Sequence, residues 1–140
     1  MKWPLMSPAE VHTFGIEVIF DHLQKKEGVT IEAVNDEVGR DPQIVGMRWG
    51  NPAFIFVRTA LYPDKGTISD QEFMRLLAWA NKHNATAFFA SVGLCCRNYS
   101  DKSEVADEKV WSLPIKNAGF AVAYEGLLVM TTSDKVRVVR

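Results

Sequence analysis

The sequence from Asp41 to Leu61 reads DPQIVGMRWGNPAFIFVRTAL. It contains two apolar runs, Gln43–Trp49 and Ala53–Leu61, which Gly50-Asn51-Pro52 separates. Apolar runs of this length, bounded by Gly, Asn and Pro, are typical of strands joined by a turn. We therefore predict a hairpin over these residues, and Ala53–Leu61 is its most apolar strand.

Upstream of the hairpin, the sequence predicts a helix and then another strand. Ser7-Pro8-Ala9-Glu10 has a capping serine, a proline at the first helical position and the glutamate of a capping box. The helix should run to about Lys26 and be largely buried, because apolar side chains surround a narrow polar stripe. His22 falls on the apolar side, which predicts a core residue. Val29–Asn35 alternates as a strand does.

Downstream of the hairpin, Ser69 caps a predicted helix over Asp70–Asn84, and Thr86–Leu94 is predicted to be a buried strand. A helix between two buried strands is the usual crossover between parallel neighbours. We expect Ala53–Leu61 and Thr86–Leu94 to pair in parallel.

The last third of the chain is predicted to be rich in strands. Cys95–Asp107 is predicted to be a polar loop, followed by short strands at Lys109–Ile115, Phe120–Tyr124 and Leu127–Thr132. The whole of residues 1–140 is then one α/β domain: an α-β-β-β-α-β core with a mixed sheet and additional C-terminal strands.

Composition excludes several function classes. The chain has 140 residues, a formal net charge of -1 and a pI near 6.3, which argues against a strongly basic nucleic-acid binder. Its apolar runs are shorter than the ~20 residues that span a bilayer, so no membrane partner is expected. Cys95 and Cys96 are adjacent, without the second ligand pair that a zinc site needs, and we expect them to pack as small apolar residues. We expect a cytoplasmic protein.

The order of elements, together with Asp41-Pro42 and the strand FIFVRT at residues 54–59, resembles the PD-(D/E)XK nuclease superfamily, whose fold is restriction-endonuclease-like. In that family an Asp on the second strand and an acid on the third hold a divalent metal, and a Lys two residues after the acid orients water. The resemblance implies that Asp41 matches the Asp, Phe56 replaces the second acid and Arg58 replaces the Lys. It also matches Glu17 to an acid on the first helix, and Gln71 to a glutamine on the second.

The departures from this motif point away from catalysis. Phe56 offers no oxygen ligand to a cation such as Mg²⁺, and Arg58 stays protonated, so it can hold a phosphate but cannot act as a base. No cofactor is therefore expected. Glu72 or Asp70 is a candidate for a migrated acid, in which case Asp41 and Glu72 would be the ligands of Mg²⁺.

Each candidate residue also has an ordinary interpretation. Asp41 lies in Gly39-Arg40-Asp41-Pro42, which is good turn chemistry without any metal. Glu17 sits within the polar stripe of its helix and could simply be solvated. Arg58 lies in an apolar strand, so it either pairs with an acid such as Asp41 or Glu17 or binds an anion. Arg48 poses the same question on the neighbouring strand.

Three functions follow from these residues. The first is a catalytically inactive or weakly active nuclease-like domain that binds nucleic acid or another anionic partner through Arg48, Arg58 and Gln71. The second is a metal-dependent nuclease that uses Asp41 and Glu72, with Glu17 in support. The third is a protein-interaction or homo-oligomerisation module in which these residues are only structural.

Overall fold

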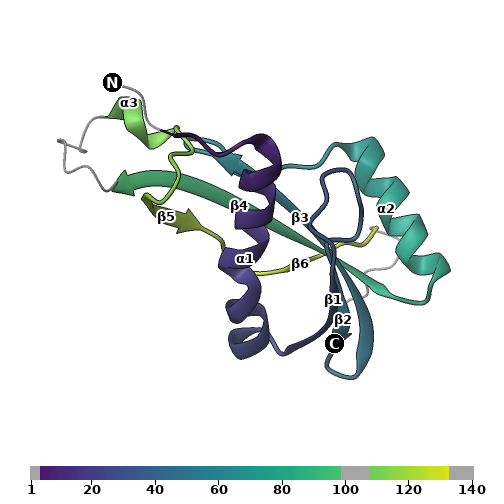
Figure 1. Ribbon diagram of the computed structural model, residues 1–140. Helices are drawn as coiled ribbons and strands as arrows, with labels where there is room; N and C mark the ends of the chain where they lie inside the picture. Colours follow the sequence, from purple (N-terminus) through teal and green to yellow (C-terminus); the bar gives the residue numbers. More distant parts are fainter. Residues whose placement is uncertain (1–3, 99–107, 133–140) are drawn as a thin grey trace, which may run out of the picture.

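The computed structural model describes residues 4–98 and 108–132, and its main feature is a mixed sheet with a helix on each face (Figure 1). Five of the six strands follow the order β1-β2-β3-β4-β5, and the sixth, β6, also pairs with β4. The α-β-β-β-α-β order and the mixed sheet agree with the prediction from the sequence. The elements are α1 (Pro8–Lys26), β1 (Val29–Val34), β2 (Ile44–Arg48), β3 (Asn51–Leu61), α2 (Asp70–Lys82), β4 (Thr86–Asn98), α3 (Glu108–Trp111), β5 (Gly119–Ala123) and β6 (Leu128–Val129).

Helix α1 begins with the predicted capping box. The Ser7 hydroxyl accepts from the backbone N–H of Glu10 at 3.2 Å, and the Glu10 carboxylate accepts from the N–H of Ser7 at 2.8 Å. Only one face of α1 is buried against the sheet, so the prediction of a largely buried helix was too strong. The buried positions are Val11, Gly15, Ile16, Ile19 and Leu23.

The prediction that His22 of α1 is a core residue was wrong. Its side chain is 44% exposed and lies 3.6 Å from the carboxylate of Glu27, with its ring edge-on to Tyr124. His22 therefore lies at the side of α1, next to Tyr124 in the segment between β5 and β6.

The two helices cover opposite faces because side chains alternate along β3 and β4. Ile55 and Val57 of β3 pack with Ile16 and Ile19 of α1. Phe56, between them, packs with residues of α2. The crossover through α2 makes β3 and β4 parallel, as predicted. The register pairs Phe56 with Phe89 and Arg58 with Ser91.

The turn of the hairpin between β2 and β3 begins one residue earlier than predicted, at Trp49 instead of Gly50. Trp49 and Gly50 have positive φ values of 52° and 82°, the backbone of a tight hairpin turn, so Asn51 and Pro52 already belong to β3. Trp49 is consequently at the tip of the hairpin, and 74% of it is exposed.

The C-terminal third contains fewer strand residues than predicted. Glu108–Trp111 forms the short helix α3 within the segment predicted to be a strand, and only Ile115 makes a β-bridge, to Leu5. The predicted loop was also wrong at its start, because β4 continues to Asn98 through pairing with β5. Residues 99–107 of that loop lie outside the described residues.

Strands β5 and β6 both pair with β4, and residues 124–127 interrupt them. The interruption is held by Glu27, the C-cap of α1: its carboxylate accepts from the backbone N–H of Leu127 at 2.8 Å and from the hydroxyl of Tyr124. Burial, followed by this hydrogen bond and charge, raises the pKa of Tyr124 well above its usual value. Among the described residues, no helix is both long and apolar enough to cross a membrane.

Candidate functional site

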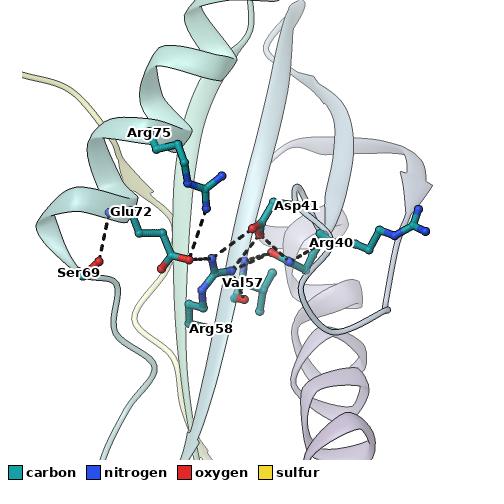
Figure 2. Close-up of polar contacts among 8 residues, drawn as sticks. Arg40, Asp41, Val57, Arg58, Ser69, Glu72 and Arg75 are labelled. Atoms are coloured by element: carbon teal, nitrogen blue, oxygen red, sulfur yellow. Dashed lines mark hydrogen bonds and ion pairs between the residues drawn. The ribbon is translucent and has the colours of Figure 1, made fainter.

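A group of charged side chains surrounds Arg58 where β2, β3 and α2 approach one another (Figure 2). Arg58 Nη1 donates to Asp41 Oδ1, and Arg58 Nη2 donates to Glu72 Oε2, each at 3.0 Å. A further bond runs from Nη2 to Asp41 Oδ2 at 3.4 Å. Arg75 extends the group, with Nη2 3.7 Å from the same oxygen of Glu72. The guanidinium thus bridges two carboxylates.

The local fold explains why these three residues meet. Asp41 lies two residues before Gln43, which precedes β2, and Arg58 points to the α2 face of β3 like Phe56. Glu72 lies in the first turn of α2, where its backbone N–H donates to the capping hydroxyl of Ser69 at 3.1 Å. That cap fixes the start of the helix, and with it the position of the carboxylate.

Gln43 connects the turn to the strand and was not recognised as a site residue. Its amide nitrogen donates to Asp41 Oδ1 at 2.8 Å and to Arg40 O at 2.9 Å. Its oxygen accepts from the backbone N–H of Val57 at 2.6 Å and lies 3.4 Å from Arg58 Nη1. With 1% exposure, Gln43 satisfies a strand N–H that has no partner on β2.

The two carboxylates keep Arg58 charged. Burial lowers the pKa of Arg58, but hydrogen bonds and charges from Asp41 and Glu72 outweigh it, so the pKa ends above its usual value. The side chains of Arg58, Asp41 and Glu72 are 20%, 14% and 32% exposed. Because both carboxylates have a fixed cationic partner, neither is left as an uncompensated buried charge.

Phe56, the residue that the resemblance led us to compare with an acid, lies in the core. Phe56 is fully buried and packs with Leu76, Leu77 and Ala80 of α2. The described residues contain no group of three or more His, Cys, Asp or Glu side chains that could hold a metal ion. Asp41 and Glu72 do converge, but on Arg58, so their oxygens do not fit a divalent cation while the guanidinium lies between them.

The charges of this site also affect the pKa of His12 of α1, a residue that was not predicted to belong to the site. Burial lowers its pKa, and so does the charge of Arg58, while Asp41 and Asp36 act in the opposite direction. His12 Nε2 is buried and has no hydrogen-bond partner in the described part of the chain. Burial and a nearby arginine therefore favour the neutral imidazole.

The structure does not bring the other predicted site residues to Arg58. Glu17 is exposed on α1 and lines a different depression, with Thr13, Phe20 and Asp36. Gln71 is exposed on α2, next in sequence to Glu72.

Arg48 is also separate. It pairs with Asn51 at the start of β3, whereas Arg58 lies near the other end of that strand. The Nε of Arg48 donates to Glu27 O at 3.0 Å. The structure therefore does not bring Arg48 and Arg58, both expected to bind the anionic partner, into one site.

An open depression of about 680 Å³ begins at Arg58, and we call it the Arg58 depression. It lies beside the C-terminal half of β3 and the middle of the parallel strand β4, where Ser91 is the register partner of Arg58. The hydrogen bonds of Arg58 are donated by Nη1 and Nη2, and Nε donates none within residues 4–98 and 108–132. The lining residues are Arg58, Thr59, Ala60, Pro63, Asp64, Lys65, Gly66, Thr67 and Ser91.

A model of one protein family, described as a domain of unknown function (DUF8840), matches residues 9–130. The chain belongs to this family. The matched region runs from the first turn of α1 to just beyond β6, so it includes the whole sheet and the residues around Arg58. Neither the curated proteins nor the solved structures contain a significant match to the chain.

Proposed function

We propose that this domain is a nuclease-like fold without metal-dependent catalysis that binds an anionic partner, with nucleic acid as the leading candidate, beside Arg58. The observation that carries the proposal is the position of Arg58, because its guanidinium bridges Asp41 and Glu72. In the nuclease superfamily that the sequence resembles, acids at this place would hold a metal ion. Here they hold a permanent cation of the protein itself.

Two differences from the nuclease motif argue against metal-dependent catalysis. Phe56 replaces an acid and is buried under α2, so an oxygen ligand is missing. Arg58 replaces a lysine, and its raised pKa excludes a role as a general base at physiological pH.

Binding is supported by the side of Arg58 that faces the Arg58 depression. Lys65 and the exposed hydroxyl of Thr67 line the same hollow. Asp64 and the ion pair of Lys65 with Glu125 offset some of this positive charge. We therefore expect modest affinity that depends strongly on salt.

The test is fluorescence anisotropy with labelled DNA and RNA oligonucleotides, measured over a salt series. The informative variant is Lys65→Gln, because it removes a charge at the depression and leaves the Asp41–Arg58–Glu72 group intact. Loss of one phosphate contact should lower the log–log salt slope by about one unit. Arg40→Gln is the matched control, since Arg40 pairs at the surface with Glu37. A wild-type protein that binds no oligonucleotide or other polyanion at low salt would contradict the proposal.

A metal-dependent nuclease remains the second candidate, and one observation favours it: Asp41 and Glu72 approach the same group of Arg58 from different elements. If Arg58 moved aside, the two carboxylates could take a cation between them. Calorimetric titration with Mn²⁺ decides between the candidates. A stoichiometric heat that disappears in Asp41→Asn would favour the nuclease, whereas no heat at millimolar Mn²⁺ agrees with the proposal.

A further inference from the structure

The loop between β3 and α2 separates two neighbouring depressions of different chemistry. The first is the Arg58 depression, and the second, of about 380 Å³, we call the Tyr62 depression. Pro63, Asp64 and Lys65 line both, so the two hollows adjoin across this loop. The Tyr62 depression is lined by Tyr62, Pro63, Asp64, Lys65, Gly93, Leu94, Cys95, Ala121, Val122 and Ala123.

The wall between the depressions is firmly held. The backbone N–H of Tyr62 donates to Leu94 O at 2.7 Å, and that of Gly66 donates to Val92 O at 3.1 Å. The Ser91 hydroxyl donates to Gly66 O at 2.7 Å. A Cβ at Gly66 would lie 1.8 Å from Arg58 O, so only glycine permits the loop to lie this close to β3. The depressions are therefore preformed, which reduces the entropy lost on binding.

The Tyr62 depression presents an aromatic ring beside an apolar floor. Tyr62 is 38% exposed, and its ring centroid lies 5.3 Å from that of Trp111, with the planes at 88°. Arg97 lies over the ring of Trp111, 4.7 Å from its centroid. Tyr62 is thus supported from one side and exposed on another, as an aromatic group that stacks on a planar ligand must be.

We propose that the two depressions together bind one phosphorylated nucleoside unit, with its base in the Tyr62 depression and its phosphate in the Arg58 depression. This inference rests on the proposed function and deepens it by naming the chemical class of the ligand. The phosphate lies between Lys65 and the Nε–H of Arg58, which has no acceptor among the described residues, and the base stacks on Tyr62. Both volumes fall in the range of about 300–1,000 Å³ that small-molecule sites occupy.

A base that enters the Tyr62 depression must be unstacked, which distinguishes single strands from duplexes. Bases inside a duplex are paired and stacked, and their faces do not reach a side chain on a protein surface. A single strand or a free nucleotide exposes those faces. Stacking accepts any base, so little sequence preference is expected.

The experiment compares a labelled single-stranded 12-mer, its duplex and the free mononucleotide, using anisotropy for the first two and competition for the third. In Tyr62→Ala, the affinity for the single strand should fall about tenfold, while Tyr62→Phe should retain it because the ring remains. Trp49→Ala is the matched control, since Trp49 is an exposed aromatic at the distant hairpin tip. Thermal melts of each variant verify the fold.

The outcomes separate this inference from the proposed function. Preference for the single strand that is lost in Tyr62→Ala supports both. Equal affinity for the duplex, unchanged by Tyr62→Ala but weakened by Lys65→Gln, overturns the nucleoside site and leaves phosphate binding in place. Competition by the mononucleotide at a concentration near the Kd of the 12-mer identifies the free nucleotide as the source of the ligand, and its absence identifies the nucleic acid. No binding to any of the three overturns both.

Discussion

Arg48 and Arg58 are both half-buried arginines of the sheet, but their surroundings differ. Arg48 lies on the α1 face, with Trp49 and Phe88 4.0 and 5.0 Å from its guanidinium carbon, and donates to the backbone at the end of α1. Arg58 lies on the α2 face, bridges two carboxylates and lines an open depression. A largely buried arginine is therefore not always available to bind an anionic ligand. Rings and a helix end enclose Arg48, whereas Arg58 retains a side that faces a hollow.

The largest expected effect concerns the core beneath Arg58. Phe56→Ala should lower the free energy of unfolding by about 3–5 kcal/mol, because the ring is fully buried against α2. Chemical denaturation measures this, with exposed Val38→Ala as the control. A loss below about 1 kcal/mol would mean that Phe56 lines an open cleft, and the α2 face would then resemble a vacant metal site.

The next effect compares the two arginines directly. Arg58→Met should cost about 3 kcal/mol, since it leaves two carboxylates without their partner. Arg48→Met should cost only about 1–2 kcal/mol, because Glu27 keeps its bonds to Tyr124 and Leu127. Urea denaturation of both variants gives the difference.

Adding Asp41→Asn and Glu72→Gln to Arg58→Met should restore part of that loss, because the unpaired charges are then gone. If the triple variant is no more stable than Arg58→Met, charge compensation is not what holds Arg58 in place.

A smaller loss of stability is expected when Gln43 is replaced. Gln43 contacts Asp41 and Arg58 and has no counterpart among the contacts described for Arg48. Gln43→Leu should lower the free energy of unfolding by about 2 kcal/mol, because the backbone N–H of Val57 loses its acceptor inside the protein. Gln71→Leu, on the exposed side of α2, is the control and should stay within about 0.5 kcal/mol of wild type. Equal losses in the two variants would show that the Gln43 network contributes little.

The smallest effect is a pH dependence from His12. Its pKa is lowered from 6.5 in the folded protein, first by burial and then by the charge of Arg58. The unfolded chain therefore takes up the proton first as the pH falls. The stability from neutral His12 is complete above about pH 6.5 and is lost as the pH falls through the lowered pKa.

Melting temperatures recorded between pH 7.5 and 5 test this dependence. The decrease on acidification should be smaller in His12→Gln than in wild type. Identical profiles for wild type and His12→Gln would contradict the account of His12.

Much of this fold is predictable from local sequence signals. Ser7 and Ser69 mark the starts of α1 and α2, and the apolar runs mark β3 and β4, because caps and periodicity depend on near neighbours. The errors occur where distant contacts decide. Helix α3 replaces a predicted strand where Val110 and Ile115 pack against Cys96 of β4, which no local pattern reveals.

The site was predictable only in part for the same reason. Asp41 and Arg58 come from motif positions, Glu72 was a candidate for a migrated acid, and the structure brings these three together. Gln43 and His12 were missed because their roles depend on a hydrogen bond to Val57 and on the charge of Arg58, elsewhere in the chain. A polar residue at the edge of an apolar strand, as in Pro42-Gln43-Ile44, is the signal that could have identified Gln43.

The bond between Glu27 and the backbone of Leu127 also has a consequence for folding kinetics. The two residues are 100 positions apart in the chain. Closing so long a loop is slow compared with forming α1 or the β2–β3 hairpin. During synthesis, the residues of α1 and of the hairpin leave the ribosome long before Leu127. Until Leu127 arrives, the carboxylate of Glu27 is hydrated by water. We therefore expect the pairing of β5 and β6 with β4 to come late in folding.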